Sequence, residues 1–149
     1  MPGDSDVWAV RLDCPPVESS RPPTVMFAQL DVPVQKGRWY RISLKAKAER
    51  LVAGSVTVTV TDTRQWRSLF EYQRFQPEKN WRTFDFLVQA RGTATEKTRF
   101  QIWYTGPGRL WLANVQLQAI PDPSQGRWQK GLYLDTPTEW DDPYRFFRW

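Results

Sequence analysis

The residue types in this chain restrict the chemistry that it can carry. Its 149 residues include no histidine and a single cysteine, Cys14. Without histidine there is no Ser-His-Asp or Cys-His relay and no histidine-ligated metal. One cysteine forms no internal disulfide and no thiolate cluster, and no basic or histidine neighbour activates this thiol. Carboxylate chemistry, lysine chemistry or binding without catalysis remains.

Hydrolysis of a glycosidic bond would need two carboxylates across a cleft. Glu71, Asp85 and Glu96 fit no recognisable catalytic motif, and Asp31 and Asp62 lie at the ends of expected strands. The sequence therefore predicts a protein that is not an enzyme.

Short runs of alternating apolar and polar residues make up the first 120 residues. The run at 39–48 alternates strictly and the run at 55–61 alternates valine with threonine, so both are expected as half-buried strands with the threonines outward. The sequence 110–117 changes phase near Ala113-Asn114, as a β-bulge would require, and 68–75 is expected as one more strand. In the other alternating runs, the apolar residues expected to point inward are Trp8, Val10, Leu12, Met26, Ala28, Leu30, Val32, Phe84, Phe86, Val88, Phe100, Ile102 and Tyr104.

About eight such strands with no helix between them predict an all-β fold, an antiparallel sandwich or barrel. No run of about 18 apolar residues is present, so no membrane span is expected. Residues 1–4 lack the charged and then apolar pattern of a secretory leader, which leaves a cytosolic protein and part of a secreted one both open.

The composition divides the chain into two parts. Residues 1–120 are expected as the β-sandwich, and residues 121–149 as an aromatic tail punctuated by proline. So many rings in the tail predict that it docks on the sandwich, leads into a further domain or binds a partner protein. Residues 1–120 have 17 basic and 11 acidic residues, a formal charge of +6, whereas residues 121–149 have 4 and 5, a charge of −1, so the basic character belongs to the sandwich part.

Three segments occur in a recognisable order. Gln29 is followed by Lys36-Gly-Arg-Trp-Tyr-Arg-Ile-Ser-Leu-Lys-Ala-Lys-Ala48, then by Trp81-Arg-Thr-Phe-Asp-Phe86 and by Gly108-Arg-Leu-Trp-Leu-Ala-Asn-Val-Gln-Leu117. This order resembles the carbohydrate-binding modules of families 4/9, 16 and 22, which are attached to polysaccharide-degrading enzymes. The resemblance covers roughly residues 7–120 and implies an antiparallel β-sandwich of jelly-roll, galactose-binding-like type.

The chain departs from this family pattern at two places. Ala113 stands where many members have an aspartate that helps to hold calcium, and a methyl group ligates nothing. No cofactor or metal site is therefore expected, and structural calcium is disfavoured. Residues 1–6 do not supply the family's first strand, so that strand is absent or the tail takes its place in the sheet.

Modules of this kind bind sugars through exposed rings and through planar polar groups that bond the hydroxyls. Trp103 is the first candidate, although it alternatively packs under the tail or a loop, and Trp66 is expected in an exposed loop. Trp39 and Trp81 are expected as mainly core. Gln29, Arg41, Gln101 and Trp103 are expected to point outward and to floor a groove if their strands neighbour one another in one sheet, with Glu71 or Gln73 joining them. Trp111 also alternates outward as a sugar-binding candidate, but near a sheet edge it could equally cover the opposite face.

The resemblance thus implies a non-catalytic module that holds a glycoside hydrolase on a plant or microbial polysaccharide. The expected partners are a polysaccharide or oligosaccharide and the catalytic domain of the same parent protein, with no membrane involved. The expected location is extracellular, and a cytoplasmic one stays open. A structural or protein-interaction sandwich is the alternative. Binding of single-stranded nucleic acid ranks third, on the isoelectric point of about 9.6 and on Arg64-Gln-Trp-Arg67.

Overall fold

A computed structural model describes residues 9–16, 23–123, 128–129, 132–133 and 146–148. These residues form strands, turns and loops, and none of their segments is a helix that could cross a membrane. The all-β prediction is confirmed.

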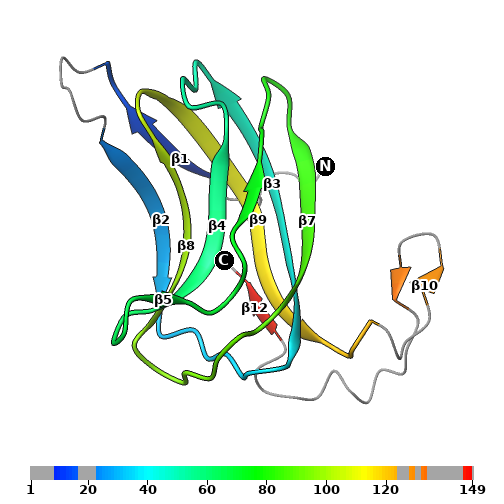
Figure 1. The fold of residues 1–149 in the computed structure, drawn as a ribbon. Helices are drawn as coiled ribbons and strands as arrows, with labels where there is room; N and C mark the ends of the chain where they lie inside the picture. The colour runs from blue at the N-terminus through cyan, green and yellow to red at the C-terminus, as the bar shows by residue number, and fades with distance from the viewer. Residues whose placement is uncertain (1–8, 17–22, 124–127, 130–131, 134–145, 149) are drawn as a thin grey trace.

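The strands form two antiparallel sheets that face each other (Figure 1). Sheet A has the order β1, β9, β3, β7, with β12 also paired to β9, and sheet B has the order β2, β8, β4, β5, with β6 also paired to β4. Sheet A consists of β1 (Ala9–Cys14), β3 (Trp39–Glu49), β7 (Arg82–Gln89), β9 (Gly108–Ile120) and β12 (Phe146–Arg148). Sheet B consists of β2 (Thr24–Leu30), β4 (Val56–Asp62), β5 (Arg67–Ser68), β6 (Gln73–Phe75) and β8 (Thr98–Thr105). A separate hairpin joins β10 (Trp128–Gln129) to β11 (Leu132–Tyr133).

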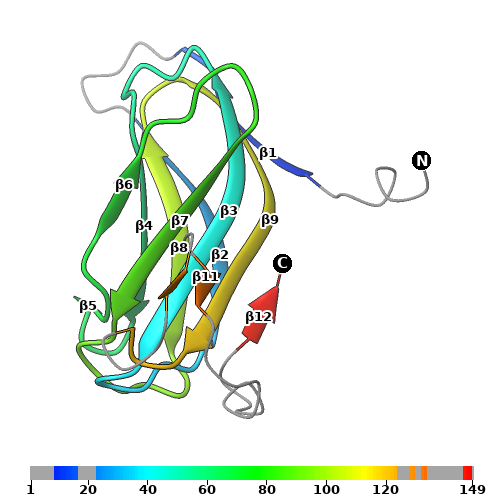
Figure 2. The same ribbon diagram turned by 90° about the vertical axis from the view of Figure 1, so that its right-hand side faces the viewer.

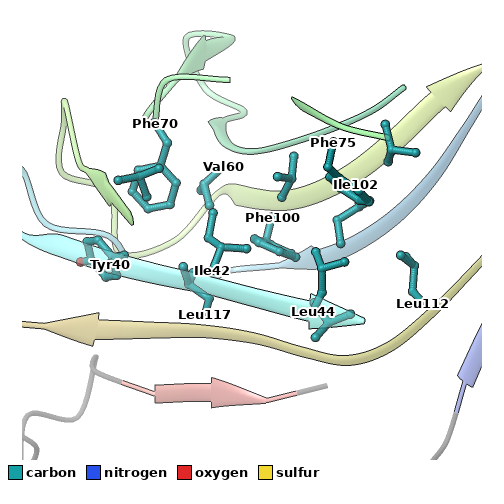
Figure 3. Close-up of a cluster of buried hydrophobic side chains, with 14 of the residues drawn as sticks. Tyr40, Ile42, Leu44, Val60, Phe70, Phe75, Phe100, Ile102, Leu112 and Leu117 are labelled. Atoms are coloured by element: carbon teal, nitrogen blue, oxygen red, sulfur yellow. The ribbon is translucent and has the colours of Figure 1, made fainter. Parts of the chain in front are cut away.

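Apolar side chains from the two sheets fill the space between them. In Figure 3, Tyr40, Ile42 and Leu44 on β3 face Phe100 and Ile102 on β8. All five side chains are at most 1% exposed, which confirms the predicted inward stripes of these strands. The core therefore fixes which residues of β3 and β8 point outward, and these are the positions open to ligands.

Strand β9 contains the predicted bulge. The register of β9 against β3 shifts between Ser43 and Lys45, and Asn114 has a positive φ of 51°. On both sides of Asn114 the neighbours Ala113 and Val115 are buried, which is the change of phase that the sequence indicated.

Two outer strands differ from the sequence expectations. In β2, Val25 and Phe27 pack against the core, whereas Leu30 is 61% exposed, so the predicted phase was wrong. Both phases of this strand contain apolar residues, and its pairing with β8 decides between them by placing Phe27 opposite Ile102. In β1, Val10 is 41% exposed because this edge strand pairs with β9 alone.

Three further expectations need correction. The threonines of β4 lie on the outer side of sheet B as predicted, but Thr57, Thr59 and Thr61 are buried, so this strand is not half-buried. The expected strand at 68–75 is two short strands, β5 and β6, separated by the buried Leu69 and Phe70. The third expectation was that Trp8, Trp39 and Trp81 lie mainly in the core.

Of the three tryptophans assigned to the core, none is shown buried there. Trp81 is 42% exposed because it lies in the turn before β7 rather than within the strand. Trp39 is half-buried, and Trp8 lies outside the described residues. The expectation for Trp39 and Trp81 rested on their positions in the family motifs. The position of each ring is instead determined by the direction of the chain at that residue.

Candidate functional site

The outer face of sheet B carries the best candidate site. On its central strand β8, Phe100 and Ile102 face the core, so Arg99, Gln101 and Trp103 point to the other side of the sheet. Met26 on β2 lies opposite Trp103 on β8. Five further residues of β2 and β4 lie opposite Arg99, Gln101 or Trp103 and so share this outer face. These are Ala28, Leu30, Thr57, Thr59 and Thr61.

Three side chains on this face are linked by direct contacts, and a fourth lies next to them on β8. The guanidinium carbon of Arg99 lies 5.6 Å from the centroid of the Trp66 ring, and Arg99 Nε donates to Gln101 Oε1 at 2.8 Å. Trp103 follows Gln101 on the same face of β8. We call Trp66, Arg99, Gln101 and Trp103 the sheet B cluster. It combines two indoles with a guanidinium and an amide, which are the group types that bind sugars.

The turn between β4 and β5 holds Trp66 above the sheet. Asp62 accepts hydrogen bonds from the backbone N–H of Arg64 at 2.9 Å and from Arg67 Nε at 3.3 Å. The hydrogen bond from the Arg64 N–H, together with those from Gln65 and Arg67, lowers the pKa of the Asp62 carboxyl below its usual 3.8. Trp66 itself has a φ of 52° and is 68% exposed, as expected for a loop ring.

Trp103 lies deeper than Trp66. It is half-buried, and its indole Nε1 is buried with no hydrogen-bond partner in the part of the chain that the structure describes. Gln101 is 7% exposed and bonded to Arg99, so its amide is held in a fixed orientation. The cluster is thus pre-ordered, with Trp66 as its most accessible ring.

The buried threonines of β4 form the floor beside this cluster. Each lies opposite a larger side chain of β8, so that Thr57 pairs with Trp103 and Thr59 with Gln101. The Thr59 hydroxyl lies 2.7 Å from the Ser68 hydroxyl and donates to the Phe70 carbonyl at 3.1 Å. These contacts explain why the threonines are buried although they do not face the core.

Arg41 and Trp111 do not join the sheet B cluster. Both lie on the outer face of sheet A, because their neighbours Ile42 and Leu112 face the core. Arg41 also forms an ion pair with Asp85, at 2.8 Å. The strands of Arg41, Gln29, Gln101 and Trp103 are not all in one sheet, so the groove expected on that condition does not form. Alternation shows which residues point outward, but not from which sheet.

Gln29 lies apart as well. It pairs with Phe100, so it shares the core-facing side of sheet B, but it is exposed at the edge strand β2. Its side-chain amide contacts the neighbouring Leu30 carbonyl at 3.4 Å. The expected outward orientation of Gln29 was wrong because the phase of β2 was wrong.

Glu71 and Gln73 line a cleft at the edge where β6 and β7 approach. The cleft has a volume of about 620 Å³ and also contains Trp39 and Gln89. Gln73 donates to the Glu71 carbonyl at 3.1 Å. The two predicted residues are thus together, but on another side of the molecule from Trp103.

Sequence reasoning missed one member of the sheet B cluster, Arg99. Its signal was present, since Arg99 alternates with Gln101 and Trp103 along β8. The contact between Arg99 and Trp66 could not be predicted from the sequence, because the turn that brings this ring over β8 depends on the hydrogen bonds of Asp62.

Three of the five acidic side chains considered for catalysis are paired with cations. Asp85 pairs with Arg41, Glu96 with Arg64, and Asp62 with Arg67. Within the described ranges, no group of three histidine, cysteine or acidic side chains is placed to hold a metal ion. Ala113 lies opposite the cation Lys45 on β3.

Comparison with known proteins adds to this picture. No protein-family profile matches the chain, and no curated protein matches it. Among solved structures, a CBM4 module matches with a TM-score of 0.60 and 13% identity over 78% of this chain and 86% of that one. The N-terminal cellulose-binding domain of Cellulomonas fimi β-1,4-glucanase C matches with a TM-score of 0.58 and 14% identity, over 76% and 80%.

A third match is a domain-sized part of a larger enzyme. The arabinose-bound GH51 α-L-arabinofuranosidase MgGH51 matches with a TM-score of 0.58 and 15% identity, over 73% of this chain but only 19% of the enzyme. The chain therefore has the antiparallel jelly-roll fold of carbohydrate-binding modules.

Proposed function

We propose that this β-sandwich is a non-catalytic carbohydrate-binding module and that it binds polysaccharide on the outer face of sheet B. The observation that carries the proposal is the sheet B cluster, in which contacts link Trp66 to Arg99 and Arg99 to Gln101, while Trp103 lies next along the same face of β8. The shared fold with carbohydrate-binding modules supports it independently.

The chemistry of the cluster fits the surface of a sugar chain. The exposed ring of Trp66 offers a flat apolar face for sugar C–H groups. The Arg99 guanidinium donates to hydroxyl oxygens, and it is already held in place by Gln101. Exposed apolar groups on β2, such as Leu30, extend the same face. A bound chain would lose little further side-chain entropy here, since most of these groups are fixed before binding.

The absence of catalysis is part of the proposal. The chain has no histidine, and the acidic groups near the cluster are engaged with arginines. A retaining or inverting glycosidase needs two carboxyl groups facing one bond, with one of them protonated at working pH. Asp62 has a lowered pKa because it accepts hydrogen bonds, which makes it unsuited to act as a general acid.

We further propose that the module works as part of a larger extracellular enzyme. Binding to a polymer would raise the local concentration of substrate around an attached glycoside hydrolase. The match to a region that is 19% of an arabinofuranosidase chain supports this arrangement. A purely structural role is the second candidate, and the pairing of β12 with the edge of β9 favours it.

Affinity electrophoresis and calorimetry against soluble β-glucan, xylan, mannan and pectin test the main proposal. We expect one of the neutral polymers to retard the wild-type protein, and Trp66→Ala and Trp103→Ala to abolish most of the retardation. Leu87→Ala is the control, since Leu87 is 42% exposed on the other sheet. Binding to none of the polymers, or full binding by both tryptophan variants, would refute the proposal.

A further inference from the structure

The outer face of sheet A carries a second group of rings, on the side of the molecule opposite the sheet B cluster. Lys47 Nζ lies 5.2 Å from the ring centroid of Trp81 and 5.0 Å from that of Trp111. The lysine comes from β3, Trp111 from β9, and Trp81 from the turn that leads into β7. One ammonium group thus lies between two indoles that start far apart in the sequence.

The sheet register orders these side chains in a row. Lys47 pairs with Trp111, and Trp111 pairs with Arg11 on β1. Because directly opposite residues share a face of the sheet, Arg11, Trp111 and Lys47 project together, with Trp81 beside Lys47. Figure 2 shows the strands that carry the row, running from β1 across β9 and β3 to β7. A bound chain lying along the row would cross β1, β9 and β3 and reach the turn before β7.

The turn before β7 fixes the outer ring of the row. The Ala48 backbone N–H donates to the Glu78 carbonyl at 2.7 Å, which ties this turn to the end of β3. Glu78 also approaches Arg82, at 4.0 Å. Trp81, between these two residues, is 42% exposed and is therefore presented to solvent by an anchored segment. Its ring is available for stacking while its position is set.

The charge along this row is positive and not neutralised. Arg11, Lys45 and Lys47 form no ion pair within the residues that the structure describes. Lys45 belongs to the neighbouring row, where it pairs with Ala113 and Thr83 and meets no carboxylate. Each of these cations retains its charge for a partner outside the described chain.

The acidic residues of this face lie to one side and are already used. In the row beyond Trp111, Asp13 and Glu49 flank Arg109, at 3.4 and 4.0 Å from its guanidinium nitrogens. Further along the sheet, Asp85 is paired with Arg41. The row of Arg11, Trp111, Lys47 and Trp81 is thus bounded by ion pairs on one side and by Lys45 on the other. An anionic chain meets attraction along the row and on its Lys45 side.

We propose that this face of sheet A is a second binding surface, specific for acidic polysaccharide, a chain of sugar units that carry carboxylates. The indoles of Trp81 and Trp111 stack on the sugar faces, and Lys47, Lys45 and Arg11 pair with the carboxylates. A neutral sugar chain would leave the cations unused, and a flat polyanion without apolar ring faces would leave the indoles unused. The surface is separate from the sheet B cluster, so it does not depend on what that cluster binds.

The probes are sodium polygalacturonate and neutral hydroxyethylcellulose, measured by affinity electrophoresis and calorimetry with the full chain. We expect polygalacturonate to bind at low salt and to be released in about 1 M NaCl, where the screening length falls to about 3 Å. The double substitution Lys45→Gln with Lys47→Gln should weaken this binding about fivefold. Trp81→Ala should weaken it at least as much while leaving its dependence on salt unchanged.

A matched control separates this surface from net charge. Lys36→Gln with Lys97→Gln removes the same two charges from exposed positions elsewhere, and it should leave polygalacturonate binding within about twofold. Equal loss in the two double variants would overturn the proposal, because it would show a general charge effect. Tighter binding of a single-stranded oligonucleotide than of polygalacturonate at equal salt would also overturn it, in favour of nucleic acid. Trp103→Ala reports on the sheet B cluster in the same assays, so failure of one surface is distinguishable from failure of the other.

Discussion

Arg99 lies over the ring of Trp66, with 5.6 Å between its guanidinium carbon and the ring centroid. Arg99 comes from β8 and Trp66 from the turn between β4 and β5, and their contact holds an exposed loop ring above sheet B. Arg99 also bonds to Gln101, so the position of Trp66 depends on a hydrogen bond made on β8. The site is therefore a coupled arrangement and not a set of independent side chains.

The contact between Arg99 and Trp66 predicts a measurable coupling. In a double-mutant cycle of Arg99→Ala and Trp66→Ala, we expect a coupling free energy of about 0.5–1 kcal/mol, typical of exposed cation–π pairs. Urea unfolding of the four proteins measures it. The pair Arg99→Ala and Trp81→Ala, on opposite sheets, should show additive effects. A coupling of zero for Arg99 and Trp66 would mean that the contact does not order the ring.

The phase of β2 relative to the core gives a second prediction. Ile102→Ala should lower the free energy of unfolding by about 2–5 kcal/mol, because this fully buried side chain leaves a cavity between the sheets. Leu30→Ala should change it by less than about 0.5 kcal/mol, since Leu30 is 61% exposed. Chemical denaturation of both variants tests the pair. A large loss for Leu30→Ala would restore the phase that the sequence suggested.

The hydrogen bonds of Asp62 predict a loss of stability in acid. Its pKa is lowered in the folded state by the Arg64 N–H above all, so the unfolded chain binds the proton more readily. The resulting stabilisation is present above the usual pKa of 3.8 and disappears as the pH falls through the lowered value.

The matched experiment measures urea midpoints from neutral pH to below pH 3.8 for wild type and Asp62→Asn. Wild type should lose more stability over this range than the variant, because only wild type can protonate this group. Glu71→Gln, a change at an exposed carboxylate outside this turn, should follow wild type. Parallel curves for wild type and Asp62→Asn would contradict the assignment.

The strands that were predictable from the sequence are those with one buried face and a strict period of two. Strand β3 alternates Tyr40, Ile42 and Leu44 with charged or small polar residues, so its inward face follows directly. Strand β2 offers Val25 and Phe27 in one phase and Met26 and Leu30 in the other. Only its pairing with β8 distinguishes the phases, and no local pattern contains that information.

The candidate site was predictable only in part, for a related reason. Alternation identified Gln101, Trp103 and Arg41 as outward, and all three are on outer faces. Whether two outward residues share a face depends on which sheet each strand joins, and this is decided by long-range pairing. Trp103 and Arg41 are consequently on opposite sides of the sandwich. Trp81 was placed in the core by family position, yet the turn that contains it points the ring outward.

Tyr104 predicts a loss of stability in alkali. Burial raises its pKa from 10.0 to about 12, so the folded state keeps the phenol protonated where the unfolded chain ionises it. The contribution of this group is complete below pH 10.0 and is lost as the pH rises towards 12. Tyr104→Phe should reduce the alkaline loss, as followed by urea unfolding. At neutral pH it should cost about 1 kcal/mol, since the Tyr104 hydroxyl donates to the Gly108 carbonyl at 2.9 Å.

The pairing of β12 with β9 predicts how truncation affects the sandwich. Phe146, Phe147 and Arg148 pair with Gln118, Leu117 and Gln116, and they occupy the edge of β9 beyond the part that β1 covers. We propose that residues 1–120 fold without the tail, because the described core cluster extends from Cys14 to Ala119. Removing β12 leaves unpaired backbone groups on β9, which favours association between copies.

Two truncations separate these effects. A chain ending at residue 145 lacks only β12, and a chain ending at residue 120 lacks the whole tail. Both should unfold cooperatively in urea, and both should form more dimer than the full chain in size-exclusion chromatography with light scattering, because each exposes the same segment of β9. If the shorter chain fails to fold while the longer one folds, residues 121–145 contribute to the core and the sandwich does not end at residue 120. If both stay monomeric, the β9 edge is protected by its own side chains and β12 has no covering role.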